Sequence, residues 1–357
     1  HVAGSVAESW PVVPVSAVTG EGIGDLFEAL DAELNAAGPT PDVGRPRMWI
    51  DRAFGIAGAG VVATGTLTGG ALSVGDRLRC FPGPEVRVRS LQSHEIDRDT
   101  IEPGSRAAAN LVGIDQQDLE RGVLLARPGS ITMSGRFLAQ LNFPPRSGGE
   151  VADRGAYHVH LGTASVSARI RALTDTETPA VMITATTPVP VMMGDRFILR
   201  DTGRRAVIAG GTVLDPSPTR KPTPCDVATL ANAARLSPDR RADALVAVHG
   251  SITAAEVDRA SGGGNPSGAI SVGARHLSED VFARRGRELQ SAVKEYHERY
   301  PLRPGLPKSE AASRLRVDAD LVTALVEANG DLAEGGPAIH LVEFTPSLGA
   351  DDVAAWE

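Results

Sequence analysis

The stretch from Ile50 to Gly70, IDRAFGIAGAGVVATGTLTGG, decides how the central part of the chain folds. Gly58 and Gly60 begin a G-x-G-x-x-A pattern, close to the fingerprint of a dinucleotide-binding loop. Such a loop needs a helix directly after it, because the helix N-terminus supplies the amides and the positive dipole that hold phosphate. The following residues are instead rich in β-branched Val and Thr and run into a Gly-Gly pair, which predicts a strand. We therefore expect a tight turn between two strands at this position.

The lysines exclude a second kind of phosphate loop. A Walker loop requires a Gly-Lys pair, but Lys221, Lys294 and Lys308 follow Arg, Val and Pro. The chain has 357 residues, which suits about two to four domains. It contains no apolar run of about 18 residues, so the sequence predicts no membrane-spanning helix and no membrane partner. Cys80 and Cys225 lie too far apart for a metal-ligand motif or a disulfide framework, which favours a reducing, cytoplasmic location.

The formal net charge of −8 is unevenly distributed. Residues 1–44 carry seven acidic side chains and residues 317–357 carry nine, and neither segment contains Lys or Arg. The central block 45–316 is therefore net basic, and nearly all of its cations are arginine, whose planar fork suits phosphate and carboxylate. Two interpretations remain open at this point: a nucleic-acid partner, or an arginine-rich composition on solvated surfaces.

The pattern of apolar and polar residues changes along the chain, and its first two parts precede residue 217. Residues 12–34 begin as a short apolar run, turn through glycines and become helical, which predicts a β-loop-α unit with Asp25 in the first helical turn. Residues 47–216 show short alternating runs punctuated by Gly, Pro and Asp, which is typical of antiparallel barrels or sandwiches. Around 127–135 we expect the boundary between two such units.

After the proline-rich linker 215–224 the period becomes helical. Ser278 is a predicted N-cap, and an apolar stripe follows it at helical spacing. That stripe consists of Leu289, Val293, Tyr296 and Tyr300. After this stripe, two short helical patterns and a hairpin turned by Gly335, Gly336 and Pro337 form a winged-helix pattern by themselves, and we expect another within 226–300.

Three stretches of the chain resemble a known superfamily. IDRAFGIAGAGVVATG, PGSRAAANLVGI (103–114) and GDRFILRD (194–201) are similar to the second and third domains of translational GTPases of the elongation factor Tu superfamily. Combined with appended winged helices, they most resemble the SelB family of selenocysteine-specific elongation factors. The resemblance implies a multidomain fold: the end of an α/β GTPase domain, two antiparallel β-barrels, then α+β winged helices. The corresponding ranges are 1–38, 45–128, 131–217, 225–301 and 302–357.

The resemblance also assigns site residues. VPVSAVTGEGI (13–23) is similar to the last guanine-contacting motif, which places Ser16 and Ala17 against the base. Asp51, Arg52 and Arg106 match the positions that hold the aminoacyl end of the tRNA. A selenol has a low pKa, so discrimination of a selenolate from neutral serine calls for fixed cations. The alternative is a structural Asp–Arg pair on a barrel rim. The family can also carry a histidine near 58–64, where this chain has none.

For cofactors and partners, the resemblance implies GTP with Mg²⁺ in an intact protein. We expect no cofactor for this chain alone, because the P-loop, the switch regions and the Asn/Thr-Lys-x-Asp motif are absent from it. The resemblance implies GTPase activity for an intact family member, whereas this chain alone is predicted to be inactive as a GTPase. The implied partners are selenocysteyl-tRNA, the ribosome and, through further winged helices, a selenocysteine-insertion mRNA hairpin. We expect a monomer. The resemblance also implies that the sequence starts late in the GTPase domain and stops before the last winged helices.

Two other functions stay open: a general translational GTPase of the same superfamily, and a winged-helix DNA-binding regulator. Acidic residues dominate the last helix and wing, which disfavours the regulator.

Four smaller clusters carry less information. His158 and His160 share a strand face without a third ligand, which disfavours a metal site. Tyr296 and Tyr300 fit a helix core better than a base-stacking platform. Two arginine clusters fit RNA phosphates or solvated faces equally well: Arg204 with Arg205, and Arg284, Arg285 and Arg287.

Overall fold

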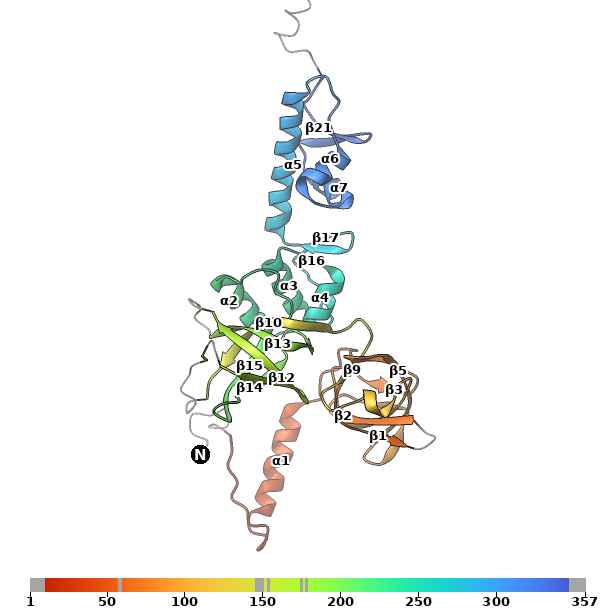
Figure 1. Ribbon diagram of the computed structural model, residues 1–357, viewed down its shortest axis with the longest axis vertical. Helices are drawn as coiled ribbons and strands as arrows, with labels where there is room; N and C mark the ends of the chain where they lie inside the picture. Colours follow the sequence, from red (N-terminus) through yellow and green to blue (C-terminus); the bar gives the residue numbers. More distant parts are fainter. Residues whose placement is uncertain are drawn as a thin grey trace, which may run out of the picture. The chain divides into compact units, whose positions relative to one another are not determined.

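The computed structural model describes residues 10–346 apart from 57–59, 145–150, 153–154, 174–175 and 177–178 (Figure 1). The chain divides into two compact units. The first comprises residues 1–236 with 259–263, and the second comprises 237–258 with 264–357. The first unit holds two barrels, and the second holds the winged-helix region. Within the described residues, no helix has both the length and the apolar character that a membrane crossing requires.

The N-terminal helix α1 spans Ile23–Ala37 and follows a left-handed glycine, Gly22, at φ 74°. A side chain there would clash with the carbonyl of Pro14, so this tight turn requires glycine. Asp25 lies in the first turn, as expected. The strand expected before the turn is not formed, because residues 11–16 pair with no strand in the part of the chain that the structure describes. No residue of α1 is buried, and its apolar stripe faces outward.

The first barrel closes six antiparallel strands in the order β4-β9-β1-β2-β8-β5, with β4 pairing β5. Their bounds are β1 Arg47–Ile56, β2 Gly60–Thr68, β4 Arg77–Phe81, β5 Glu85–Ser93, β8 Arg106–Val112 and β9 Leu124–Ala126. The smaller elements are β3 Leu72–Ser73, β6 Ile96–Arg98, β7 Thr100–Ile101 and the 3₁₀ helix η1 Gln116–Asp118.

The glycine-rich stretch forms the predicted hairpin. β1 and β2 pair antiparallel, with Ile56 opposite Gly60, and β2 continues as a strand where a phosphate loop would need a helix. The turn residues 57–59 lie outside the described residues. At the far end, Gly69 adopts φ 74°, and a side chain on Gly70 would collide with the backbone of Arg45, so the Gly-Gly pair lets the linker pass closely. The prediction of two paired strands is confirmed.

The core of this barrel is almost wholly aliphatic. Inward positions alternate along the strands, as in β8, where a residue of intermediate or full exposure follows each buried one. Met48, Ile50, Leu67, Leu78 and Leu91 are at most 2% exposed and anchor the cluster. Removal of this apolar area from water is the main stabilising contribution to the barrel.

The second barrel closes in the order β10-β13-β12-β11-β14-β15. Its strands are β10 Thr132–Asn142, β11 Tyr157–Leu161, β12 Ala164–Ala172, β13 Ala180–Val191, β14 Arg196–Asp201 and β15 Ala206–Asp215. Its core contains an aromatic pair, Phe137 and Phe197, whose ring centroids lie 6.3 Å apart at 80°. This edge-to-face arrangement is the one that aromatic quadrupoles prefer.

A buried ion pair joins the two barrels. Arg47 donates through both terminal nitrogens to the two carboxylate oxygens of Asp195, at 2.7 and 2.9 Å. The hydroxyl of Thr163 donates to the carbonyl of Ile50 at 2.6 Å beside this pair. The first unit continues into α2, Pro224–Ala233, which Thr223 and Asp226 cap in a capping box.

The second unit begins with α3 Pro238–His249 and β16 Ser251–Thr253, and later continues with β17 Ile270–Val272 and β18 Arg275–Leu277. Between β16 and β17 lies α4 Ala254–Ser261, whose residues from 259 onward belong to the first unit. The three strands form the sheet β16-β18-β17. A complete winged-helix order follows. It comprises α5 Glu279–Arg299, β19 Leu306–Pro307, α6 Lys308–Leu315, α7 Ala319–Glu327, β20 Leu332–Gly335 and β21 Ala338–Leu341.

Helix α5 matches its sequence pattern. The hydroxyl of Ser278 accepts a hydrogen bond from the amide of Val281, which confirms the predicted N-cap. Leu289, Val293 and Tyr296 are buried, in one core with residues of α6, α7 and β21. The expected boundary at 301 would group this helix with the segment 225–301, but in the structure it packs in the later winged helix. The reason is that its apolar stripe has its partners on α6 and α7.

Candidate functional site

Asp51 lies at an irregularity in β1. The register with β2 runs Ile50 opposite Gly65 and then Arg52 opposite Thr64, so Asp51 has no direct partner across the pair. Such a bulge adds one residue to a strand and changes the direction of its side chain. Asp51 is thereby held at the barrel surface, where it is partly exposed.

Two neighbouring strands complete a network around this carboxylate. Nη1 of Arg106, the first residue of β8, donates to Oδ2 of Asp51 at 2.5 Å. The hydroxyl of Thr64 on β2 donates to Oδ1 at 2.8 Å. Thr66 stands opposite Arg106 in the β2–β8 pair, with its hydroxyl 3.5 Å from the same guanidinium nitrogen. Three strands of the barrel therefore position this cluster.

In this cluster the Asp51 carboxylate is hydrogen-bonded, and the guanidinium of Arg106 beside it carries a positive charge. The hydrogen bond from Arg106 lowers the pKa of Asp51, and the Thr64 hydroxyl and the charge of Arg52 add to that effect. The same bond raises the pKa of Arg106. The Arg106 side chain stays 50% exposed, against 21% for Asp51. Because a guanidinium has five N–H donors, the exposed side of Arg106 keeps donors available for an anion.

The structure brings together two of the three residues predicted for the aminoacyl end. Asp51 and Arg106 are directly bonded. Arg52 is exposed beside them on β1 and acts on Asp51 through its charge. One carboxylate thus faces two guanidinium groups, which leaves the surface locally positive. The role of the three residues in binding stays a prediction.

Sequence reasoning missed the polar residues that support the cluster. Thr64 and Thr66 occupy the same face of β2, and their spacing of two was the available signal. On the other side of Arg106, the hydroxyl of Ser93 donates to the Arg106 carbonyl at 2.8 Å. The ring of His94 lies 3.2 Å from that hydroxyl. A histidine therefore stands near Arg106, although it comes from the turn after β5.

The other predicted pair, Ser16 and Ala17, lies in a compact turn before α1. Gly20 donates its amide to the Ser16 carbonyl at 2.8 Å, and the amide of Thr19 reaches the Ser16 hydroxyl at 3.2 Å. This turn offers backbone groups for a base but nothing for phosphates. The residues that the structure describes do not fit the phosphates of GTP, because the glycine stretch leads into a strand and none of the three lysines follows a glycine.

The outer face of the second barrel carries a different set of polar side chains, namely histidines, serines and arginines. His158 lies opposite Ser167 on β12 and Arg200 on β14, and its ring nitrogens contact the hydroxyls of Ser165 and Ser167 at 3.2 and 3.0 Å. Further cations on the outside of this barrel include Arg169, Arg171 and Arg196. The acidic residue at its edge is Asp201, which pairs with Arg204. Among the described residues, no group of His, Cys, Asp and Glu is arranged to hold a metal ion.

Comparisons with known proteins agree with this architecture. Residues 147–220 match the family model described as "Selenocysteine-specific elongation factor, beta-barrel domain", and residues 290–341 match "Elongation factor SelB, winged helix". The selenocysteine-specific elongation factor of Desulfomicrobium baculatum is 33% identical over 60% of this chain and 35% of its own length. That of Escherichia coli is 28% identical over 87% of this chain and 52% of its own length.

A solved structure shows the same fold over most of the chain. The crystal structure of a bacterial selenocysteine-specific elongation factor, EF-Sec, aligns with a TM-score of 0.73 and 19% identity, over 92% of this chain and 55% of that one. The chain thus spans about half or less of the length of these relatives. In its two barrels, its winged-helix region and the two matched family models, the chain is similar to SelB selenocysteine-specific elongation factors of the elongation factor Tu superfamily.

Proposed function

We propose that this chain forms the tRNA-binding part of a selenocysteine-specific elongation factor. In this proposal the aminoacyl end of selenocysteyl-tRNA binds at Asp51, Arg52 and Arg106 on the first barrel. The observation that carries the proposal is the geometry of one surface carboxylate bonded to Arg106 and flanked by Arg52. In the intact protein, GTP would act as the switch that delivers the tRNA to the ribosome, and this chain alone would neither hold nor hydrolyse it.

The chemistry of the cluster suits an anion next to an amine. A selenolate would accept hydrogen bonds from the exposed side of Arg106 and from Arg52, and such charge-assisted bonds are stronger than those to a neutral hydroxyl. Asp51 would orient Arg106 and stay ionised at neutral pH, because its pKa is lowered. The carboxylate would also attract the protonated α-amine of the aminoacyl group. Serine offers no negative charge to the two arginines.

The second barrel would supply affinity that does not depend on the amino acid. Its outer face places Arg200 beside His158, with the hydroxyls of Ser165 and Ser167 in the same region. Arginines and hydroxyls are the groups that most often contact the nucleic-acid backbone. Contacts of this kind position an RNA without reading its sequence, which suits a long tRNA held at its charged end by the other barrel.

The substitution Arg106→Ala tests the proposal. Binding should be measured for one tRNA charged either with selenocysteine or with serine. We expect selenocysteyl-tRNA to lose about ten- to a hundredfold in affinity, because hydrogen bonds between charged groups contribute about 1.5–3 kcal/mol. Seryl-tRNA should lose much less, since it gives Arg106 no anion to bind.

The matched control is Arg98→Ala, which removes an exposed arginine from β6 of the same barrel. It should leave the ratio of the two affinities unchanged. Equal losses for both tRNAs in Arg106→Ala would contradict a selenolate pocket and favour a general translational GTPase. Loss of folding in the variant would be recognised by circular dichroism before any binding measurement.

A further inference from the structure

Helix α5 has two faces of different chemistry. One face buries Leu289, Val293 and Tyr296 in the winged-helix core. On the opposite side four polar residues follow one another at spacings of three and four, which places them on one face of a helix. These residues, which we call the α5 row, are Arg284, Arg287, Ser291 and Lys294, and all four are exposed.

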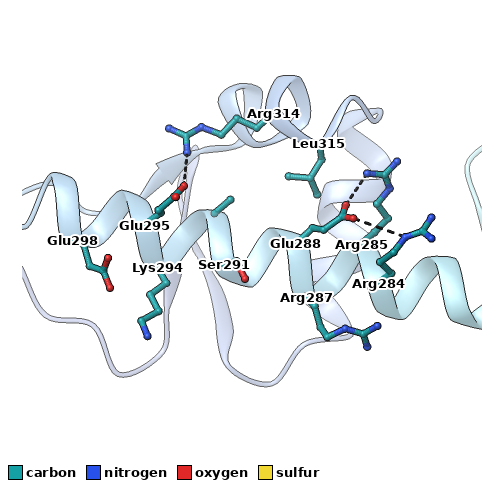
Figure 2. A pocket seen from close by; sticks show the side chains of 11 residues that line it. Arg284, Arg285, Arg287, Glu288, Ser291, Lys294, Glu295, Glu298, Arg314 and Leu315 are labelled. Carbon is teal, nitrogen blue, oxygen red and sulfur yellow. Dashed lines mark hydrogen bonds and ion pairs between the residues drawn. The ribbon is translucent and has the colours of Figure 1, made fainter.

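Two of the three cations in the α5 row, Arg287 and Lys294, form no side-chain bond within the described part of the fold. Arg284 and Arg285 both pair with Glu288, at 3.8 and 2.7 Å. Arg287 and Lys294 form no ion pair or hydrogen bond with any residue that the structure describes. In Figure 2 they extend from the same side of α5, away from Glu288.

An open groove of about 800 Å³ runs along this region. Besides the α5 row, it is lined by Arg314 of α6, whose guanidinium bonds Glu310 at 2.7 Å and lies 3.8 Å from Glu295. The acidic residues of the lining are Glu288, Glu295 and Glu298, against five cations. The groove is therefore net positive, and its excess charge lies on Arg287 and Lys294.

The helix that reads nucleic acid in helix-turn-helix proteins cannot take this role here. In that arrangement the second helix of the pair enters the major groove. Helix α7 occupies that position, but Asp318 precedes it, it carries Asp320 and Glu327, and it contains no Lys or Arg. Phosphates would be repelled from α7. The first helix, α5, instead carries four arginines and one lysine.

We propose that the α5 row binds the sugar-phosphate backbone of duplex RNA. Double-stranded RNA is recognised by its shape and backbone, because its major groove is too deep and narrow for side chains to read. A row of cations along a helix suits such contacts without insertion of a recognition helix. From Arg284 to Lys294 the row extends about 15 Å along the helix axis, which is enough to follow several phosphates. This inference rests on the proposed function, in which the chain binds tRNA, and that function makes RNA rather than DNA the expected polyanion.

The double variant Arg287→Ala/Lys294→Ala in the full chain tests this proposal. A fluorescently labelled short duplex RNA is titrated at a series of salt concentrations. We expect the slope of log affinity against log salt to become shallower by about 2, since each lost phosphate contact changes it by about 1. The affinity at low salt should fall about tenfold.

The matched control is Arg240→Ala/Lys308→Ala. It also removes one arginine and one lysine from the second unit, but these cations pair with Asp243 and Glu334. Its slope should equal that of the unchanged protein. If it falls as far as that of the row variant, the effect is one of net charge and the proposal is wrong.

A third variant should gain affinity, which a folding defect would not produce. Glu298 follows Lys294 at a spacing of four and lines the same groove. Glu298→Gln removes a negative charge next to the proposed phosphates, so duplex RNA should bind several-fold more tightly. Unchanged affinity in both Glu298→Gln and the double variant would overturn the proposal. Tighter binding of a DNA duplex of equal length would overturn the assignment to RNA.

Discussion

The two barrels have the same number of strands, but the polar side chains on their outer faces are arranged differently. On the first barrel, a bulge in β1 positions Asp51, and hydrogen bonds from Arg106 and Thr64 hold its carboxylate. The second presents an exposed Arg200, a partly exposed His158 and neighbouring hydroxyls, and the carboxylate at its edge, Asp201, pairs with Arg204. The interiors differ less: one is aliphatic, and the other adds an aromatic pair. The barrel fold fixes where outward side chains stand, and the residue types decide whether a face is suited to a chemical group or to a backbone.

The largest expected effect tests whether each barrel is a structural unit of its own. Phe137 is fully buried in the second barrel and packs edge to face on Phe197. Phe137→Ala should destabilise that barrel by about 3–5 kcal/mol, because it removes buried area and leaves a cavity. Amide hydrogen exchange should show the loss of protection mainly in β10–β15.

The control for this experiment is Phe54→Ala, which truncates a phenylalanine that is 45% exposed on β1 of the first barrel. Exchange should change little in that variant. Equal loss of protection in both barrels after Phe137→Ala would mean that the Arg47–Asp195 ion pair couples them into one cooperative unit, and the comparison of separate barrels would fail.

A smaller effect separates the proposed tasks of the two faces. Arg200→Ala removes a cation opposite His158 on the second barrel. We expect tRNA binding to weaken a few-fold and the salt slope to decrease by about 1, since one phosphate contact is lost. The affinity ratio of selenocysteyl-tRNA to seryl-tRNA should stay constant, because a backbone contact does not sense the amino acid.

Arg106→Ala is the paired measurement, since it should change that ratio. If Arg200→Ala alters the ratio as much as Arg106→Ala does, the division of labour between the barrels is wrong. If Arg200→Ala leaves the salt slope at its original value, the second barrel does not contact the tRNA through this face.

Local chemistry made parts of this structure predictable. The hairpin at Gly60 follows from β-branched residues after the glycines, and the cap at Ser278 follows from a hydroxyl in front of acidic residues. The long apolar stripe of α5 was equally clear. Which winged helix that stripe would pack against was not, because a stripe specifies a buried face and leaves the partner open.

The candidate site was less accessible to such reasoning. Asp51 and Arg106 are 55 positions apart and meet only because β2 lies between β1 and β8. The resemblance to a known family implied both residues, but the alternation of apolar and polar residues in β1 did not predict the bulge at Asp51. Thr64 and His94 can be recognised as neighbours of the cluster only once the strand register of the barrel is known. A single sequence does not encode that register locally.

The smallest expected effect concerns pH. Partial burial, together with the charges of His158 and Arg200, lowers the pKa of His160 on the second barrel. Neutral His160 therefore stabilises the folded state fully above pH of about 6.5, the unfolded value, and this contribution is lost as the pH falls through the lower folded pKa. On the first barrel, the Arg106 bond lowers the pKa of Asp51 from 3.8, so that contribution is lost only below pH of about 3.8.

Between pH 7 and 5 the two faces should thus respond differently. Hydrogen exchange, corrected for its intrinsic pH dependence, should show β11 and β14 opening more easily at the lower pH, with β1 and β2 unchanged. His160→Asn should flatten the response of β11, because asparagine does not titrate, whereas His94→Asn on the first barrel should leave it as it was. An equal acid response with and without His160 would contradict the role of His160 in this pH dependence.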